Sequence, residues 1–328
     1  MDASIVRNAL APSMARILGL SFHFHDSAAA LVDGGRVIAA SAEERFTRRK
    51  HTSEFPRRAI EYCLDAGTLA SINDLDAIVF YEKPLRKMLR VVETFVTGWP
   101  YNFQGFTARL PDYLKGKVNL VKLIASELPG YGGPVMFSEH HLSHAASACL
   151  CSPFEECAVL TLDGVGEAET TTIGAYRDGS LRLERAIHFP HSVGLFYSAL
   201  TAYLGFSVND AEWKVMGLAP YGRPVYVDAM RRMMTIHDDG SFALDLRYFA
   251  HHYSTRLAVN AEAWEALLGF PRRLPDEDLQ PHHQDLARSG QAVVEELILA
   301  LAAEAGRVTG SRNLAIAGGV GLNSVANW

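Results

Sequence analysis

Two segments of the chain repeat the same order of predicted elements, and this repeat constrains the fold more than any other feature of the sequence. The first segment is ILGLSFHFHDSAAALVDGGRVIA, beginning at Ile17, and the second is AVLTLDGVGEAETTTIGAYRDGSLRLERAI, beginning at Ala158. Each predicts a strand, a polar or glycine-bearing loop, a second strand, a turn containing Asp-Gly and a third strand. The expected strands cover residues 15–24, 28–32 and 36–42 in the first segment and 158–162, 170–176 and 181–188 in the second. We interpret the pair as an internal duplication.

A duplicated three-stranded meander followed by helices is typical of the architecture that actin, sugar kinases and Hsp70 share, an α/β fold with two lobes. We therefore predict a first lobe over residues 14–156, with a helical insertion at about 84–130, and a second lobe over residues 157–328, which we expect to be incomplete at its C-terminus. Residues 1–13 are expected to form a loose extension. The same pattern also arises by chance and in unrelated mixed folds, so it favours this architecture without proving it.

The composition limits the classes of function. With 48% hydrophobic residues among 328, the chain can bury a sizeable core. Its formal net charge of −6 and its lack of a long basic run argue against a strong electrostatic interaction with nucleic acid. The sequence contains no uninterrupted run of 18 apolar residues and therefore predicts no membrane span. The four cysteines have neither C-x-x-C nor zinc-ribbon spacing. We expect a cytoplasmic protein with a small-molecule substrate and no nucleic-acid or membrane partner.

Two histidines and an aspartate form the strongest candidate for a metal site. His140 and His144 are four residues apart in a predicted helix, so both imidazoles project from one face, whereas His141 points about 100° away. Asp163 ends the next apolar strand, at the edge where α/β folds bind their ligands. Two nitrogens and a carboxylate suit Fe(II), Zn or Mn. The alternatives are a solvated polar helix face and an aspartate that only begins a turn.

Two loops near the N-terminus carry candidates for acid–base or anion chemistry. His25 and Asp26 follow the first strand of the first repeat, a position suited to proton transfer or to orienting a phosphate. The segment EERFTRRKH supplies Lys50 and His51, together with three arginines, as candidates for holding a phosphate or carbamoyl oxygen. The structural alternative is that Asp26 caps a turn and that the charged segment is simply solvated.

A glycine pair follows the last predicted strand, residues 314–317. Gly318 and Gly319 allow a ligand to approach the backbone closely, and Asn323 can hydrogen-bond a ribose or a base. Such a pair is weak evidence for a nucleotide site when taken alone. The segment KVMGLAPYG, beginning at Lys214, is predicted as a glycine-punctuated loop whose purpose the residues alone do not indicate. Neither the G-x-x-x-x-G-K-[ST] loop nor the G-x-S-x-G motif is present in the sequence.

Taken together, these motifs resemble a known family. In chain order, HDSAAALVDGGRVIAASAEERFTRRKH, HHLSHAASA, TLDGVGE, KVMGLAPYG and AGGVGLN are similar to the O-carbamoyltransferases of the NodU/CmcH type, which carbamoylate hydroxyls of antibiotics and nodulation factors. The resemblance extends over most of the chain from Met14 and is weakest at residues 84–130 and 236–285. The related tRNA threonylcarbamoyl transferases share the H-x-x-x-H helix, but the ERFTRRKH and KVMGLAPYG segments look like the small-molecule branch.

The resemblance implies a Kae1-like domain of the actin-like ASKHA fold that binds an adenine nucleotide and a metal. A divalent metal is implied, with Fe(II) expected and Zn, Mn or Mg as alternatives, and its ligands would be His140, His144 and Asp163. The implied transfer-site residues are His25 and Lys50. The implied part of the nucleotide cleft is formed by Gly318, Gly319 and Asn323.

In that family a separate C-terminal YrdC-like domain makes carbamoyladenylate from carbamoyl phosphate and ATP. The Kae1-like domain then transfers the carbamoyl group to the acceptor hydroxyl and releases AMP. The family's last metal-binding aspartate and its YrdC-like domain both lie downstream of the GG-x-x-LN motif, outside these residues. Three hypotheses therefore stand: a small-molecule O-carbamoyltransferase, a catalytically incomplete nucleotide- and metal-binding fragment, and a tRNA threonylcarbamoyl transferase-like enzyme. A sugar kinase is a fourth alternative.

Overall fold

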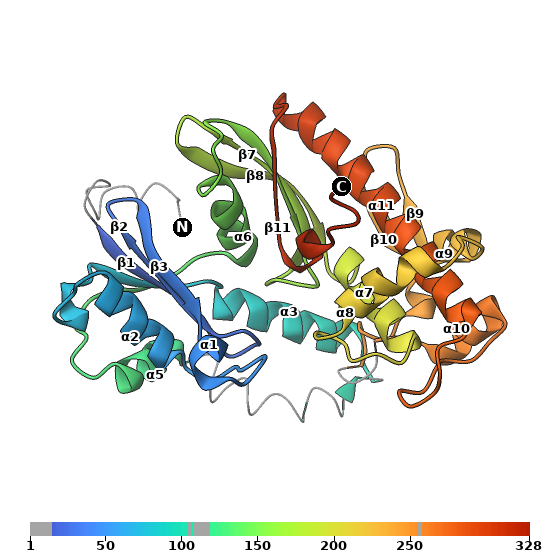
Figure 1. The fold of residues 1–328 in the computed structure, drawn as a ribbon, viewed down its shortest axis with the longest axis horizontal. Helices are drawn as coiled ribbons and strands as arrows, with labels where there is room; N and C mark the ends of the chain where they lie inside the picture. Colours follow the sequence, from blue (N-terminus) through green and yellow to red (C-terminus); the bar gives the residue numbers. More distant parts are fainter. Residues whose placement is uncertain (1–14, 101, 104–106, 108–118, 255–257) are drawn as a thin grey trace. The chain divides into compact units, whose positions relative to one another are not determined.

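The computed structural model describes residues 15–100, 102, 103, 107, 119–254 and 258–328, which form two compact units (Figure 1). Unit 1 comprises Met1–Leu85 and Arg109–Glu139, and unit 2 comprises Arg86–Ala108 and His140–Trp328; only their described residues are considered below. The predicted extension at residues 1–13 and part of the predicted helical insertion lie outside the described residues. Among those that are described, no helix combines the length and the apolarity that crossing a membrane requires.

Unit 1 is built on a five-stranded sheet with the order β3-β2-β1-β4-β5. The strands are β1 (Arg16–Ser21), β2 (Ala28–Asp33), β3 (Arg36–Ala42), β4 (Ala77–Phe80) and β5 (Val135–Phe137). β1, β2 and β3 form the antiparallel meander predicted for the first repeat, and Gly34 and Gly35 supply the positive φ angles of its second turn. β4 then pairs in parallel with β1, and β5 pairs in parallel with β4.

One face of this sheet is apolar and is covered by helices. The helices of unit 1 include α1 (Glu44–Thr47), α2 (Arg57–Ala66) and α5 (Leu120–Glu127). Leu18 of β1 and Leu31 of β2 are cross-strand partners, and both belong to one buried cluster with Ile60 of α2 and Ile124 of α5. α2 and α5 therefore pack on the same face. α1 is a single turn within the charged segment that the sequence predicts as a loop.

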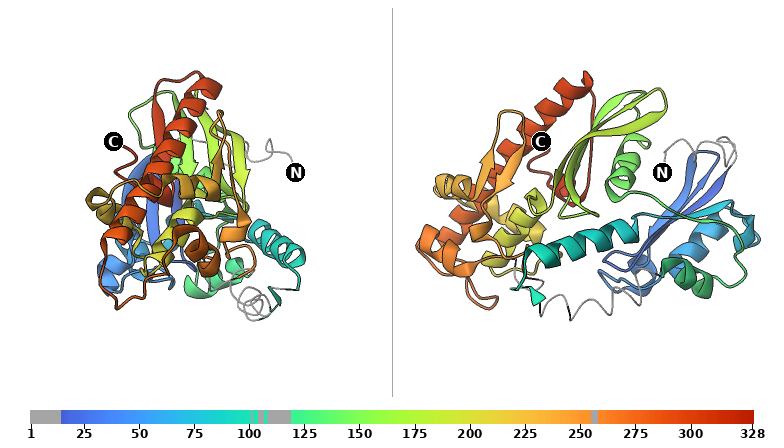
Figure 2. Two further views of the ribbon diagram at one scale, coloured as in Figure 1. Left: turned by 90° about the vertical axis from the view of Figure 1, so that its right-hand side faces the viewer. Right: turned by 180° about the vertical axis from the view of Figure 1, so that it is seen from behind.

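Unit 2 repeats this arrangement on a four-stranded sheet with the order β11-β6-β7-β8 (Figure 2). The strands are β6 (Cys157–Leu162), β7 (Glu169–Arg177), β8 (Ser180–His188) and β11 (Leu314–Ala317). β6, β7 and β8 form the second antiparallel meander, and β11 pairs in parallel with β6. The order corresponds to β4-β1-β2-β3 in unit 1. The duplicated, actin-like α/β architecture predicted from the sequence is therefore confirmed.

The two faces of the unit 2 sheet are covered by different helices. α6 (His140–Cys149) packs on the face that carries Val159 of β6. α7 (Val193–Tyr203) and α11 (Pro281–Thr309) cover the opposite face, which carries Leu160. Because neighbouring side chains of a strand point to opposite faces, all six residues of β6 are buried. The strand that leads to Asp163 is thus fixed from both sides.

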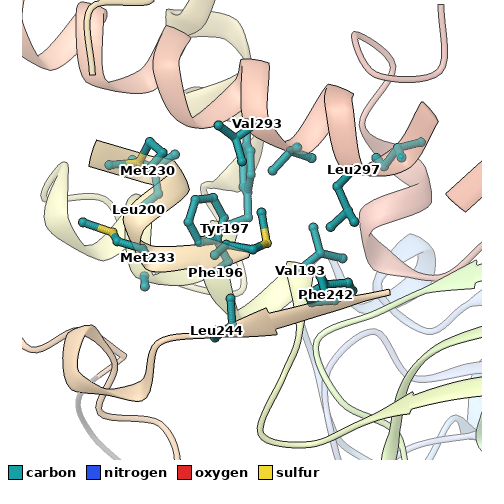
Figure 3. Close-up of a cluster of buried hydrophobic side chains, with 14 of the residues drawn as sticks. Val193, Phe196, Tyr197, Leu200, Met230, Met233, Phe242, Leu244, Val293 and Leu297 are labelled. Atoms are coloured by element: carbon teal, nitrogen blue, oxygen red, sulfur yellow. The ribbon is translucent and has the colours of Figure 1, made fainter. Parts of the chain in front are cut away.

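A large apolar cluster holds α7 and α11 together and extends to the elements that follow α7 (Figure 3). These elements are α8 (Glu212–Leu218), α9 (Val227–Met233), β9 (Met234–Ile236), β10 (Phe242–Leu244) and α10 (Ala261–Leu268). The side chains labelled in Figure 3 are Val193, Phe196, Tyr197, Leu200, Met230, Met233, Phe242, Leu244, Val293 and Leu297. This packing fixes the position of α7, whose first turn contacts the loop after β6.

The structure differs from the sequence predictions at several boundaries. The segment around Lys214, predicted as a loop, contains α8 and a 3-10 turn, because Val215 and Ala219 are buried four residues apart on one face. α9 ends at Met233, where the chain continues into β9. α11 begins at Pro281, since proline is favoured in the first turn of a helix.

The division into units also differs from the predicted lobe boundary between residues 156 and 157. The compact units divide between Glu139 and His140, because α6 packs on β6 and therefore groups with unit 2. Part of the predicted insertion belongs to unit 2 as well: α3 (Pro84–Thr97) passes from unit 1 into unit 2 after Leu85.

Candidate active site

Three side chains of unit 2 converge at the edge of its sheet. His140 and His144 project from α6, and Asp163 directly follows β6. His140 Nε2 lies 2.8 Å from Asp163 Oδ2 and 3.1 Å from His144 Nε2, and His144 Nε2 lies 3.4 Å from the same carboxylate oxygen. One ligand atom from each residue thus lies within 4.8 Å of the other two. The helix spacing and the strand end bring these residues together as the sequence analysis expects.

These separations fit a divalent cation. Ligand atoms about 2.1 Å from a metal lie about 3.0 Å apart at octahedral angles and about 3.4 Å apart at tetrahedral angles. The two facing imidazole nitrogens, 3.1 Å apart, also require a proton or a cation between them, because two lone pairs at this distance repel each other. Two imidazoles and a carboxylate suit Fe(II), Zn or Mn. The residues present therefore fit a metal site, and the identity of the metal stays a prediction.

The backbone of Asp163 is held from two sides. Its amide donates to the carbonyl of Thr170 at 2.9 Å, and the Ser192 hydroxyl donates to the Asp163 carbonyl at 3.1 Å. Ser192 also caps α7. A Cβ at Gly194, in the first turn of α7, would come within 2.7 Å of the same carbonyl oxygen, so this position has no room for a side chain. The helix start therefore packs directly on the loop that carries the carboxylate.

The charge of Asp163 is stabilised by the histidines beside it. Burial raises the pKa of this carboxyl, but hydrogen bonds and electrostatic attraction from His140 and His144 outweigh burial and leave the pKa well below its ordinary value. The carboxylate is therefore ionised at neutral pH, which is the form that binds a metal.

Glu167 and His141 support this cluster without belonging to it. The buried carboxylate of Glu167 accepts a hydrogen bond from the His140 amide at 3.2 Å, at the first turn of α6. His141 Nε2 donates to the Glu169 carbonyl at 2.9 Å, so its Nδ1 accepts from the Thr161 hydroxyl at 2.6 Å. Burial lowers the pKa of His141 to about 4. Both ring nitrogens of His141 are used internally, which confirms that it points away from His144 and Asp163. The sequence analysis did not identify Glu167, although it ends the TLDGVGE motif.

The glycine turn after β11 lies against the cluster of His140, His144 and Asp163. The Gly319 amide faces Asp163 Oδ1 at 3.3 Å. Gly318 has a φ of 94°, and a Cβ there would overlap the carbonyl oxygen of Leu162, so only glycine fits. Because β11 pairs in parallel with β6, the residues that follow the two strands meet at one edge of the sheet. The predicted nucleotide turn and the predicted metal ligands are therefore neighbours.

Asn323 points inward in this structure. Its amide group forms a reciprocal pair with the amide of Gln291 on α11, with both hydrogen bonds at 3.0 Å. The Tyr197 hydroxyl donates to the same Gln291 oxygen at 2.9 Å. Asn323 is buried, and this network anchors the end of the glycine turn to α7 and α11. Its expected contact with a nucleotide stays a prediction, and Gln291 had no signal in the sequence because the pair joins residues 32 positions apart.

The remaining predicted residues, His25 and Lys50, lie in unit 1. His25 is in the loop after β1, and its Nδ1 lies 2.6 Å from Asp26 Oδ2. Lys50 is exposed in the loop after α1 and has no ion-pair partner among the described residues. The residue after it, His51, places its Nδ1 3.1 Å from Asp26 Oδ1. The sequence pattern indicates His25 and Asp26 as candidates but gives no signal for their contact with His51.

Unit 1 also contains a cavity of about 760 Å³ between the β1 and α1 loops and the helices. Its lining includes three arginines and four glutamates; of the sequence candidates it contains Arg49, but neither His25 nor Lys50. Arg49 pairs with Glu54, and Arg57 pairs with Glu127. Because the opposite charges are paired in this way, the cavity does not favour binding of an anionic ligand.

The chain matches one protein family and is similar in sequence to several longer proteins. It matches the family described as "Carbamoyltransferase N-terminus" over residues 16–328. It is 44% identical over 322 residues to the uncharacterized protein sll1178 of Synechocystis, covering 96% of this chain and 52% of the relative. It is 31% identical over 306 residues to the nodulation protein NolNO of Sinorhizobium fredii, covering 92% of this chain and 42% of that protein. The chain spans about half the length of these relatives.

Similarity to solved structures is weak. HypF of T. kodakarensis matches with a TM-score of 0.45 and 12% identity, covering 96% of this chain and 43% of that one. YeaZ of Pseudomonas aeruginosa matches with a TM-score of 0.28 and 18% identity, covering 52% of this chain and 65% of that one. At these TM-scores the fold assignment rests on the strand order of the two sheets.

Proposed function

The chain belongs to the carbamoyltransferase family, and from this premise we propose that it transfers a carbamoyl group from carbamoyladenylate to a hydroxyl of a small-molecule natural product, assisted by a divalent metal. The observation that carries the proposal is the convergence of His140, His144 and Asp163 beside the Gly319 amide. A small-molecule acceptor is preferred to tRNA because the net charge of −6 opposes binding to a polyanion.

The proposed step is a nucleophilic substitution at the carbamoyl carbon. The acceptor oxygen forms a bond to this carbon, the bond from the carbon to the phosphate oxygen breaks, and its electron pair leaves with AMP. The hydroxyl proton passes to a protein base. The protein therefore has to align the acceptor, accept one proton and stabilise the charge that develops on the departing phosphate.

Two residues of unit 1 are proposed to take part, one by accepting the proton and one by holding the donor. His25 is the proposed proton acceptor, and its Nε2 makes no hydrogen bond with any residue that the structure describes. Lys50, exposed in the neighbouring loop, is proposed to hold the carbamoyl or phosphate oxygen. In unit 2, the backbone of Gly318 and Gly319 is proposed to lie close to the nucleotide, with Asn323 fixing the turn.

His140, His144 and Asp163 are proposed to hold the metal, with Fe(II) as the first candidate and Zn, Mn or Mg as alternatives. When bound, this metal would supply positive charge to the phosphate oxygens of the leaving AMP. Binding of phosphate is favoured over activation of a water, since an activated water would hydrolyse the donor. The donor itself is proposed to come from carbamoyl phosphate and ATP on a YrdC-like domain in the cytoplasm.

The proposal is tested with the purified chain and preformed carbamoyladenylate. AMP release and a gain in acceptor mass equal to one carbamoyl group are expected with sugars and other polyols as acceptors. A His140→Ala, His144→Ala double variant should lose both bound metal and transfer, whereas His237→Ala, at an exposed histidine, should keep both. Full transfer by the double variant would contradict the proposal. Metal and nucleotide binding without any transfer would favour the catalytically incomplete fragment, and tight, salt-sensitive tRNA binding would favour the tRNA-modifying relative.

A further inference from the structure

The carboxylate of Asp26 lies between two imidazoles. His25 Nδ1 is 2.6 Å from one carboxylate oxygen, and His51 Nδ1 is 3.1 Å from the other. Each oxygen therefore has its own histidine. The three side chains come from two loops, one after β1 and one after α1.

This geometry fixes where the ring protons are. An ionised carboxylate only accepts hydrogen bonds, so each histidine has to carry its proton on Nδ1 in order to donate. A neutral His25 with a proton on Nδ1 has a lone pair on Nε2, the atom that makes no hydrogen bond with the described residues. The side chains of His25 and Asp26 are 38% and 47% exposed, so a ligand can reach this part of the loop. A carboxylate that holds a histidine in this way is a recurring device for making the distal nitrogen a base.

The backbone keeps the two loops in register. The Ser27 amide and hydroxyl both donate to the Thr52 carbonyl, each at 3.0 Å, and the His23 amide donates to the Ser53 carbonyl at 3.0 Å. Ser27 and Thr52 are both buried. The two donors flank His25 and Asp26 on the first loop, and both acceptors directly follow His51 on the second, so the bonds hold Asp26 close to His51.

The local conformations are also unusual. Asp26 and His51 have φ angles of 57° and 55°, in the left-handed region that non-glycine residues occupy rarely. At these angles the Asp26 side chain bends back to its neighbour His25, while the His51 side chain meets it from the second loop. An exposed ion pair gains little by itself, so the surrounding loops have to hold this arrangement.

We propose that Asp26 and His51 are positioning residues that hold His25 in the Nδ1–H tautomer, so that its Nε2 accepts the proton of the acceptor hydroxyl. This inference rests on the proposed function. It gives His51 a role different from phosphate binding: His51 donates to the second carboxylate oxygen and prevents Asp26 from rotating away from His25. In the transfer step, the proton moves from the acceptor oxygen to His25 Nε2 as the bond to the carbamoyl carbon forms.

The first part of the test does not depend on activity. In the chain with ¹⁵N-labelled histidine, nuclear magnetic resonance at a pH above the usual range of histidine titration reports which ring nitrogen of His25 carries the proton. The wild type should show Nδ1–H, and Asp26→Asn should shift His25 towards Nε2–H. Asp33→Asn makes the same substitution at another exposed carboxylate of unit 1, which pairs with Arg16, and should leave His25 unchanged.

The second part uses an isosteric pair at His51, because Asn and Asp both tolerate a positive φ. His51→Asn keeps a donor near the Nδ1 position, and His51→Asp replaces it with a group that only accepts and that repels Asp26. With carbamoyladenylate as donor and glycerol or N-acetylglucosamine as hydroxylated probe, His51→Asp and Asp26→Asn should lower kcat about 10²-fold with little change in KM. His51→Asn should retain most of the wild-type kcat, and circular dichroism should show that all variants are folded.

Each outcome decides the proposal. Loss of the Nδ1–H tautomer in Asp26→Asn together with the kcat defect of His51→Asp supports it. If the wild type transfers the carbamoyl group and both His51→Asp and Asp26→Asn keep its kcat, the positioning role is overturned and the proposed function stays intact. The same conclusion follows if wild-type His25 carries its proton on Nε2. A wild type with the Nδ1–H tautomer and no transfer to any hydroxylated probe overturns the proposed function, and the positioning role in transfer with it.

Discussion

Replacing Asn323 by alanine tests whether this residue fixes the glycine turn. The substitution removes the two hydrogen bonds with Gln291 and a third in which Asn323 Oδ1 accepts from the Ala326 amide at 3.1 Å. It also leaves the buried Nε2 of Gln291 without a partner in this network, while its Oε1 still accepts from Tyr197. At about 1 kcal/mol for each of the three net hydrogen bonds, with a desolvation penalty of about 1–3 kcal/mol added for the abandoned donor, the free energy of unfolding should fall by about 4–6 kcal/mol.

The assay is chemical and thermal denaturation followed by circular dichroism. For a unit of this size, such a loss lowers Tm by roughly 8–24 °C. Asn327→Ala is the matched control, because Asn327 is exposed and donates only one side-chain bond, to the Gly321 carbonyl; its effect should stay within about 1 kcal/mol.

A double-mutant cycle with Gln291→Met separates this network from a simple loss of packing. Since each single variant leaves a polar partner buried, the double variant should be more stable than the sum of the two by about 1–2 kcal/mol. Additive effects of the two substitutions, within about 0.5 kcal/mol, would refute the structural role. An Asn323→Ala variant that is as stable as wild type but binds AMP less tightly would also refute it and would point to direct contact with the nucleotide.

Three further outcomes follow from the structure. A metal at about 100 times its Kd should raise the free energy of unfolding by about 2.7 kcal/mol, measured as a Tm increase with Zn²⁺, Mn²⁺ or anaerobic Fe²⁺. His144→Ala should abolish this increase and His237→Ala should keep it. An equal increase in both variants would contradict the ligand set. Burial lowers the pKa of His251 to about 4, below the usual value of about 6.5, so the unfolded chain binds the proton first as pH falls. The free energy of unfolding should therefore decrease by about 3 kcal/mol between pH 6.5 and pH 4. Denaturation of His251→Gln should show a shallower pH dependence, and an unchanged slope would count against this assignment. Gly318→Ala should destabilise the protein by more than about 3 kcal/mol, because strain at positive φ adds to overlap with a carbonyl oxygen. Gly35 has a φ of 80° and open space around it, so Gly35→Ala should destabilise by only about 1 kcal/mol. Equal Tm values for the two variants would exclude the overlap.

Much of the fold is predictable because its determinants are local. The Asp33-Gly34-Gly35 turn and the alternating strands on either side of it predict the first meander, and the pairing of β2 with β3 confirms it. The cluster of His140, His144 and Asp163 is predictable for a similar reason: four residues make one helical turn, and the next strand delivers the carboxylate to the same sheet edge.

The parts that the sequence did not predict depend on long-range packing. The contact between Asp26 and His51 exists only because two loops are joined by backbone hydrogen bonds, and neither loop carries a periodic pattern that would reveal the other. The inward orientation of Asn323 depends likewise on Gln291 in the middle of α11. Lys214 was placed in a loop because glycines punctuate its segment, whereas burial of Val215 and Ala219 selects a helical turn.

The Gly319 amide donates to the Asp163 carboxylate, so the glycine turn and the predicted cation site share one group. One oxygen of Asp163 faces the backbone of the turn, and the other faces both histidines, so neither side can move the carboxylate without the other responding. If a cation bound at Asp163 changes the affinity for a ligand at the turn by some factor, that ligand changes the affinity for the cation by the same factor. Asp163 would then couple the occupancy of the two predicted sites.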